Sequence, residues 1–131
     1  HPVAEHAVAG TFAGLRRGFR PNVDCYHTDD PHELTVVVEL SGVEPESVNI
    51  VVGERALFIR GERLRPKAEG RHYQQVEIEY GPFQRQIRLA ENVDPTRAHA
   101  HFERGFLTIT LPVAEKPPAP GGRIAIEVRR G

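Results

Sequence analysis

The sequence predicts an all-β chain that folds as an immunoglobulin-like antiparallel β-sandwich. Short stretches in which apolar and polar residues alternate recur between residues 33 and 111. Turn signals rich in Gly, Pro, Asn and Asp separate these stretches. At this spacing we expect seven or more short strands with no internal helix, which is the pattern of a sandwich.

The expected strands follow one another in chain order. Each has apolar residues at every second position, so that one side faces a core. They span Leu34–Leu40, Val48–Val52, Val76–Tyr80, Phe83–Leu89 and Leu107–Leu111. The turn signals between strands include Asp29-Asp30-Pro31, Ser41-Gly42, Gly53-Glu54, Gly81-Pro82, Asn92-Val93-Asp94-Pro95 and Arg104-Gly105.

Length and charge narrow the class of protein. A chain of 131 residues fits one domain that buries roughly two-thirds of its unfolded surface. Its 17 basic and 18 acidic residues nearly cancel, so no global field indicates a nucleic acid or a membrane surface as partner. All but two of the basic residues are Arg, which suits ion pairs at interfaces, although genomic composition explains the bias equally well.

The single cysteine and the lack of long apolar runs indicate a compartment. Cys25 cannot form an internal disulfide, and no segment approaches the about 20 apolar residues of a membrane span. The first residues, His1 to Glu5, have neither the basic nor the apolar region of a signal peptide. We therefore expect a cytoplasmic protein.

The N-terminal segment differs from the strands that follow. Val8, Phe12, Leu15 and Phe19 recur at the spacing of one helical face. Glycines at positions 10, 14 and 18 each weaken such a helix by roughly 1 kcal/mol relative to Ala. Residues 1–20 are therefore expected to form a flexible arm.

The C-terminal segment reads as a tether that carries two isoleucines. Residues 115–122 are rich in Pro and Gly, which gives an extended and hinged linker. In an extended chain Ile124 and Ile126 point the same way, so both can enter one groove while Ala125 points out. Burying each is worth roughly 1.5 to 3 kcal/mol, part of which the ordering of the tail offsets, so such docking is weak and reversible. The alternative is a terminal strand that completes its own sandwich.

Several motifs in chain order resemble the small heat-shock proteins of bacterial type, the α-crystallin or Hsp20 family. The motifs that carry the resemblance are Ala100-His101-Phe102-Glu103-Arg104-Gly105-Phe106-Leu107, Leu111-Pro112, Ile124-Ala125-Ile126, Leu57 to Arg63 and Tyr80 to Arg85. The resemblance extends from Pro21 to Ile126 and implies an α-crystallin domain over residues 21–113. The arm of residues 1–20 would precede it and an extension over residues 114–131 would follow. Ala90, Arg104 and Phe106 depart from the residues usual in the family.

The resemblance implies a groove at a sheet edge. It would lie between the strand Val48 to Val52 and the strand Ala98 to Phe102. The small side chains of Ala98 and Ala100 would leave a depression that an isoleucine fills. The expected lining residues are Val48, Ile50, Val52, Ala98, Ala100 and Phe102. The alternative is that all six are ordinary core residues.

The resemblance also implies a strand-swapped homodimer, with higher oligomers possible. The loop Leu64 to Gln75 would carry a short strand, His72, Tyr73, Gln74 and Gln75, that pairs with the partner subunit. Arg85 shares an otherwise apolar strand face, where an unpaired charge would be costly. We expect it at the dimer contact, with an intramolecular partner or exposure beyond the sheet rim as alternatives.

Enzymatic interpretations find little support in the sequence. His99 and His101 offer two metal ligands on one strand face without a third at a known spacing. Cys25 and His27 share a face without an orienting group. No Gly-x-x-x-x-Gly-Lys run indicates nucleotide binding. We therefore expect no catalytic, metal or cofactor site, and a hydrolase or metalloenzyme is the weakest alternative.

The function predicted from these features is that of an ATP-independent holdase. It would bind exposed apolar segments of unfolding client proteins and release them to ATP-dependent chaperones. The expected client surfaces are the groove and the arm residues Phe12, Leu15 and Phe19. The second hypothesis is a co-chaperone adaptor with the same sandwich that does not hold clients itself.

Overall fold

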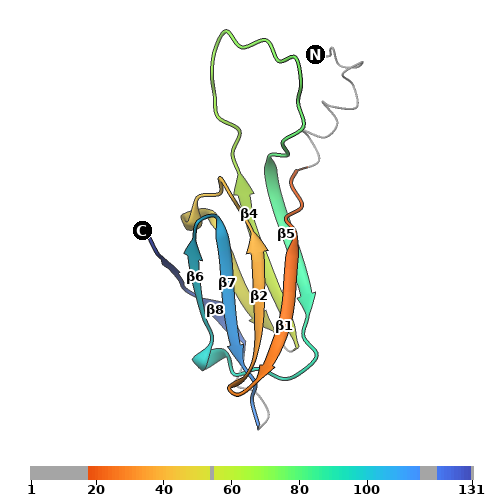
Figure 1. Cartoon of the computed structure of the whole chain (residues 1–131), viewed down its shortest axis with the longest axis vertical. Helices are drawn as coiled ribbons and strands as arrows, with labels where there is room; N and C mark the ends of the chain where they lie inside the picture. Colours follow the sequence, from red (N-terminus) through yellow and green to blue (C-terminus); the bar gives the residue numbers. More distant parts are fainter. Residues whose placement is uncertain (1–17, 54, 116–120, 131) are drawn as a thin grey trace.

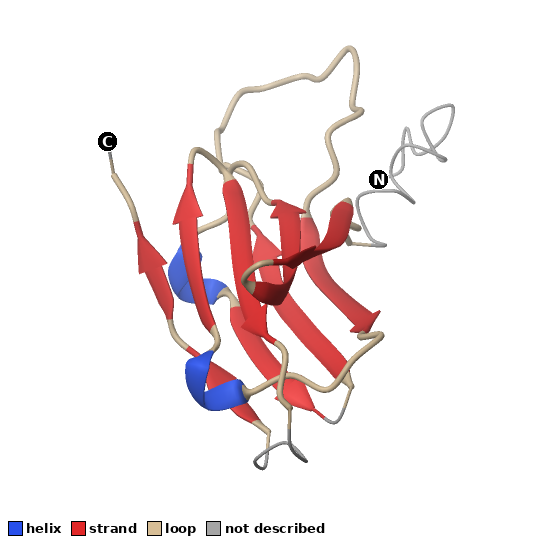
Figure 2. Ribbon diagram, turned by 60° about the horizontal axis from the view of Figure 1, so that its bottom comes forward, coloured by secondary structure: helices blue, strands red, loops and turns tan. Residues whose placement is uncertain are grey.

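The computed structural model describes residues 18–53, 55–115 and 121–130, which form a two-layered β-sandwich. One layer is a five-stranded sheet in the order β1-β2-β7-β6-β9, and the other is a four-stranded sheet in the order β5-β4-β3-β8 (Figure 1 and Figure 2). The strands are β1 Val23–Asp29, β2 His32–Glu39, β3 Asn49–Gly53, β4 Ala56–Arg63, β5 Gly81–Arg88, β6 His99–Glu103, β7 Phe106–Pro112, β8 Gly122–Ile124 and β9 Ile126–Val128.

The interior between the sheets confirms the predicted sandwich. Inward positions of β2 and β7 lie opposite each other in register, as Val36 does with Ile109 and Val38 with Leu107. These side chains have no exposed surface, and Leu57 and Ile59 of β4 close the core from the other sheet. All strand pairs are antiparallel except β6 with β9, which is parallel.

The turn between β6 and β7 requires backbone conformations that most residues avoid. Arg104 and Gly105 both have positive φ, at 55° and 83°. This is the two-residue hairpin turn that favours Asn followed by Gly, so Arg104 occupies a strained position where the family usually has asparagine. A Cβ on Gly105 would also lie 3.0 Å from the Cα of Ser41, and the carbonyl of Gly105 accepts a hydrogen bond from the Leu40 amide.

The predicted strand over Val76–Tyr80 is wrong, although its residues alternate. The structure has no strand between β4 and β5, and Ile78 is 60% exposed. β4 pairs with β3 and β5 on its two edges, and the segment runs into β5 at Gly81 without a turn that could fold it back onto the free edge of β5. The connections also contain two 3-10 turns of three residues each, η1 over Pro45–Ser47 and η2 over Pro95–Arg97. Both begin at a proline, whose fixed φ favours a helical start.

One side chain at the end of β4 joins three connecting segments. Arg63 donates hydrogen bonds to the carbonyls of Glu79, at 2.9 Å from Nε, and of Ser41, at 3.1 Å from Nη1. Its guanidinium carbon lies 3.6 Å from the centre of the Phe19 ring, in a cation–π contact. Arg63 therefore ties the segment before β1, the turn after β2 and the end of the long loop to the same strand.

Replacing this side chain should destabilise the sandwich measurably. We expect Arg63→Gln to lower the free energy of unfolding by about 1 to 3 kcal/mol, because two carbonyls lose a charged donor and one ring loses its cation. Arg60→Gln, on an exposed position of the same strand, is the matched control and should change it by less than about 0.5 kcal/mol. Denaturant unfolding of both variants measures the difference, and equal effects would contradict the role of Arg63.

Candidate binding groove

The six residues expected to line a groove come together where the two sheets end. β3 and β6 belong to different sheets, each is the neighbour of a tail strand, and each directs its inward side chains toward the other sheet. Five of these residues are buried and Ala98 is partly buried: Val48, Ile50, Val52, Ala98, Ala100 and Phe102. They share one apolar cluster, and the groove is filled in this structure by the chain's own tail.

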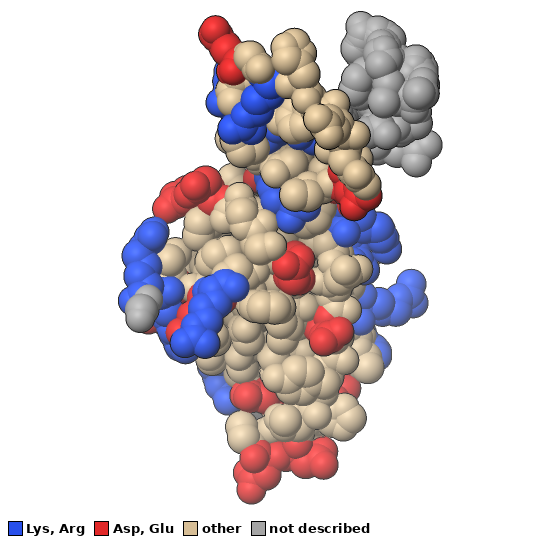
Figure 3. Space-filling model, turned by 45° about the horizontal axis from the view of Figure 1, so that its top comes forward, with Lys and Arg blue, Asp and Glu red and all other residues tan. Residues whose placement is uncertain are grey.

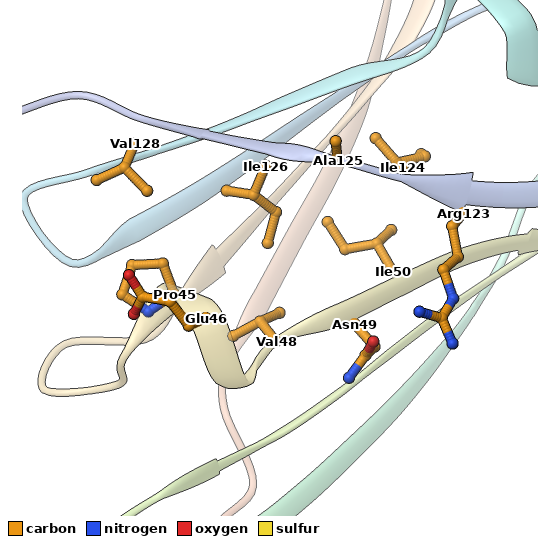
Figure 4. A pocket seen from close by; sticks show the side chains of 10 residues that line it. All are labelled: Pro45, Glu46, Val48, Asn49, Ile50, Arg123, Ile124, Ala125, Ile126 and Val128. Carbon is orange, nitrogen blue, oxygen red and sulfur yellow. The ribbon is translucent and has the colours of Figure 1, made fainter.

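The tail pairs with one sheet over residues 122–124 and with the other sheet over residues 126–128. Gly122–Ile124 pairs antiparallel with β3, which places Ile124 opposite Ile50. Ile126–Val128 then pairs parallel with β6, which places Ile126 opposite Ala100. Ala125, between the two strands, is exposed. Figure 4 shows Ile126 directed toward Val48 and Ile50 from the tail above them. In the single chain the tail therefore lies between β3 and β6 and also adds a strand to each sheet. Docking of the isoleucines and completion of the chain's own sandwich are thus the same arrangement.

The two isoleucines are not equivalent. Ile124 is only 8% exposed and belongs to the core cluster, whereas Ile126 is partly buried against it. A hydrogen bond from the Arg129 amide to the Phe102 carbonyl, 2.8 Å long, extends the second pairing. A side chain at Gly121 would clash with the carbonyl oxygen of Val52, so glycine allows the tail to approach β3. Ile124 is the main anchor.

A hollow remains beside the tail because β8 leaves β3 after three residues. Its volume is about 490 Å³, and Pro45, Val48, Ile126 and Val128 give it an apolar lining. Glu46 and Arg123 supply charges of opposite sign (Figure 4). The first part of β3, at Asn49, has no strand neighbour on this side among the described residues. The hollow therefore combines an apolar surface with an open strand edge.

The placement of Phe19 differs from our expectation of an exposed arm. The ring is 9% exposed, and it packs edge-to-face on Phe83 with 5.7 Å between the ring centres. The Phe19 amide also donates to the carbonyl of Pro82. Burial of this ring covers the apolar end of the sandwich, so Phe19 is part of the core in the single chain. Phe12 and Leu15 lie outside the described residues.

The segment expected to exchange between subunits is exposed and forms no strand in the single chain. His72, Tyr73, Gln74 and Gln75 are all exposed. Hydrogen bonds from Arg71 and then Arg65, two residues of the same loop, lower the pKa of the Tyr73 hydroxyl. At the other side of the molecule, β1 pairs with β2 alone among the described strands. Most of β1 is exposed, so its outer edge is open to another strand.

Arg85 has a partner within its own chain. It lies on the inward face of β5, as the alternation predicted, and its Nη1 donates a 2.6 Å hydrogen bond to the Pro21 carbonyl. Burial, and secondarily the charge of Arg20, lower the pKa of its guanidinium. This contact favours the intramolecular alternative over the dimer contact that we expected.

The residues considered for catalysis or metal binding lie apart. Within the described part of the chain, no group of three or more His, Cys, Asp or Glu could hold a metal ion. Cys25 is exposed overall, yet partial burial of its thiol raises the pKa, which is opposite to the activation that a nucleophile needs. His99 is exposed, and the Nδ1 atom of His101 is buried without a hydrogen-bond partner. No helix among the described residues is long and apolar enough to cross a membrane.

Some residues of the groove were missed from the sequence. Val128 and Pro45 line the hollow, and the parallel pairing of β9 with β6 was not expected. Val128 follows Ile124 and Ile126 at the same period of two, so continuing that pattern by one step could have found it. Pro45 carries no such signal, because its position depends on the tertiary fold.

Comparisons with known proteins agree with one another. The Hsp20/alpha crystallin family matches residues 26–129. Small heat shock protein C2 of Rickettsia felis is 34% identical over 97 residues, which cover 73% of this chain and 62% of that protein. The structure of heat shock protein 16.0 from Schizosaccharomyces pombe superimposes with a TM-score of 0.68 at 32% identity, covering 76% of this chain and 71% of that one. A small heat-shock protein from Xylella fastidiosa gives 0.65 at 26% identity, covering 78% and 94%. The chain spans between 42% and 62% of the length of four heat-shock relatives that it matches.

Truncating the main anchor should loosen the tail. We expect Ile124→Ala to weaken docking of the tail by about 2 to 3 kcal/mol, because a buried side chain loses most of its apolar contacts. The Arg129 amide, which is hydrogen-bonded to Phe102, should then exchange its hydrogen faster. Native-state hydrogen exchange measures this rate. Ala125→Ser, at the exposed position between the two strands, is the control, and an unchanged rate in Ile124→Ala would contradict the anchor assignment.

Proposed function

The chain belongs to the Hsp20/alpha crystallin family, whose members are generally chaperones, and we propose that it acts as an ATP-independent holdase. The observation that carries the proposal is the groove between β3 and β6, an apolar slot at a sheet edge that only two three-residue strands of the tail cover. A segment of an unfolding protein has the same chemistry as that tail, namely apolar side chains on an extended backbone.

Release of the tail would open two kinds of binding group together. The inward side chains of β3 and β6 would offer apolar contacts, and both strands would offer unpaired backbone donors and acceptors. An extended client segment can satisfy both by adding a strand to a sheet edge. Because each tail strand has only three residues, the cover is short enough to exchange with a client.

The proposed client surface consists of the groove and the adjoining hollow. The hollow already accepts a side chain without movement of the tail, since its volume is about 490 Å³. Phe19 is left out because it is buried. Phe12 and Leu15 stay predictions for the arm.

We also propose a homodimer formed through the long loop. The exposed segment His72–Gln75 would pair with the open outer edge of β1 in a second subunit, which would extend the five-stranded sheet by one strand. We further propose that the domain boundaries lie at residues 21 and 113 and that the protein is cytoplasmic. It would deliver bound clients to ATP-dependent chaperones and would have no enzymatic activity.

The holdase proposal predicts protection without nucleotide. At about one subunit per client, the chain should suppress most of the heat-induced light scattering of an unrelated protein, because apolar segments bind before they aggregate. Addition of ATP should change nothing. Undiminished scattering by the client would reject the holdase in favour of a co-chaperone adaptor.

A disulfide that holds β8 on β3 tests whether release of the tail opens the groove to clients. Val51 and Arg123 are direct partners on antiparallel strands, at a spacing that a disulfide can bridge. In a Cys25→Ser background, Val51→Cys/Arg123→Cys should protect clients poorly when oxidised and regain full protection when reduced. Equal protection in both states would place client binding elsewhere, and the Cys25→Ser protein alone is the control for the redox treatment.

The dimer proposal predicts the effect of shortening the loop. Replacing Leu64 to Gln75 by a tight turn should give a folded monomer, because no strand could then reach the partner's β1. Sedimentation measures the mass, and thermal unfolding checks that the sandwich remains. A shortened chain that is still dimeric at micromolar concentration would contradict the exchanged loop.

A further inference from the structure

The outer face of the five-stranded sheet is acidic. Strand register and burial show which residues point away from the core on β1, β2, β7, β6 and β9. Among these outward strand positions the charged residues other than His are all carboxylates: Asp24, Glu33, Glu39, Glu103 and Glu127. In the view of Figure 3, red residues lie on a largely tan surface and blue residues gather toward its margins.

The outer face of the four-stranded sheet has the opposite sign. Outward positions of its strands carry three arginines, Arg60, Arg88 and Arg123, and one carboxylate, Glu62, at the end of β4. All four are exposed. The net charge of −1 for the whole chain therefore does not reveal that these two faces carry charges of opposite sign.

Each face also carries exposed apolar surface between its charges. Tyr26 and Phe106 on the acidic face are 51% and 48% exposed. On the basic face Val51 is 38% exposed beside Phe58, and the two border a hollow of about 310 Å³ together with Asn49, Arg60 and Gln84. One face therefore presents exposed aromatic rings, and the other presents a hollow beside exposed apolar surface.

We propose that the acidic outer face of one copy docks on the basic outer face of a second copy. The occupant of each face is a second copy of this chain because both halves of the charge complementarity are present in one molecule, and the acidic face would repel a polyanion. The two faces are different surfaces, so the contact is heterologous and leaves one acidic and one basic face free at the ends of a stack. It uses neither the six groove residues nor the open edge of β1, and Arg123 borders both the basic face and the hollow beside the tail.

Charge reversal of one face at a time tests this contact. Arg60→Glu/Arg88→Glu makes both faces negative, and Glu33→Lys/Glu39→Lys/Glu103→Lys makes both faces predominantly positive. Each variant alone should associate at least about tenfold more weakly than the parent at low ionic strength, and an equimolar mixture of the two should associate again. The association of the parent should weaken by a similar factor between about 0.05 M and about 0.5 M salt, since added salt screens exposed charges. Sedimentation velocity measures all four samples.

Controls separate the face contact from a general effect of charge. Arg97→Glu/Arg130→Glu changes the net charge by the same amount at exposed positions away from the basic face, and it should associate as the parent does. Thermal unfolding of each variant checks its fold. Unchanged association in the two face variants, or a mixture that stays dissociated, overturns the proposal. Nucleic acid that co-purifies with the parent and is lost in Arg60→Glu/Arg88→Glu, with self-association unchanged, overturns it in favour of a polyanion as the occupant.

A chemical test of the same contact does not depend on charge. Gln86, in the middle of the edge strand β5, and Thr108, on the central strand β7, are outward positions of the basic and the acidic face, and each can be replaced by cysteine in a Cys25→Ser background. The mixed disulfide between Gln86→Cys and Thr108→Cys proteins should form at least about tenfold faster than either like disulfide at low salt. Equal rates for all three disulfides contradict a contact between unlike faces.

Discussion

The sandwich depends on how one edge is closed. Apart from the tail strands β8 and β9, β3 and β6 are the outermost strands of the two sheets at this side, so without the tail that edge would combine unpaired backbone groups with access to the apolar interior. An uncovered apolar strand edge would be unfavourable, because it pairs readily with other chains. The tail covers both the backbone groups and the apolar interior: it adds one strand to each sheet and buries Ile124 between the sheets. Since the same chemistry describes an unfolded client segment, closure of the fold and the proposed capture of clients use one surface.

The end of the sandwich where β4 finishes combines one charged side chain with buried aromatic rings. Arg63, at the end of β4, contacts Phe19 and donates hydrogen bonds to the Ser41 turn and to the end of the long loop, while Phe19 packs on Phe83. The long loop rises from this end of β4 in Figure 1. Sites with no shared partners contribute nearly additively to stability. We therefore expect loosening of the tail to leave the loop in place, and movement of the loop to leave the groove closed. The proposed assembly through the loop and the proposed binding in the groove would then vary independently.

Strands whose alternation agreed with an available sheet position were predictable from the sequence. The family resemblance named six residues that the fold gathers in one apolar cluster, and their role as a binding groove stays a prediction. The predictions that failed share a cause. A local sequence pattern does not show which part of the fold a segment or side chain will pack against. Val76–Tyr80 alternates as a strand does, but β4 has no free edge for it. Phe19 fits a helical face, yet the unfilled end of the core at Phe83 determines where it lies. Arg85 was placed correctly on the inward face, while its partner is a backbone carbonyl 64 residues away, which no side-chain pattern indicates.

The composition gives only the net charge, and it does not show that charges of opposite sign lie on the outer faces of the two sheets. Those faces are formed by every second residue of each strand. In β2 and β6 the outward positions carry Glu33, Glu39 and Glu103, whereas in β4 and β5 they carry Arg60, Arg88 and one carboxylate, Glu62. The core requires only that the inward positions be apolar, so the stability of the fold does not explain why carboxylates predominate outside one sheet and arginines outside the other. Surface charges change stability little but alter association strongly. Segregation of the charges by sheet therefore bears on which surfaces meet when two copies approach, and a near-zero net charge does not argue against electrostatic association.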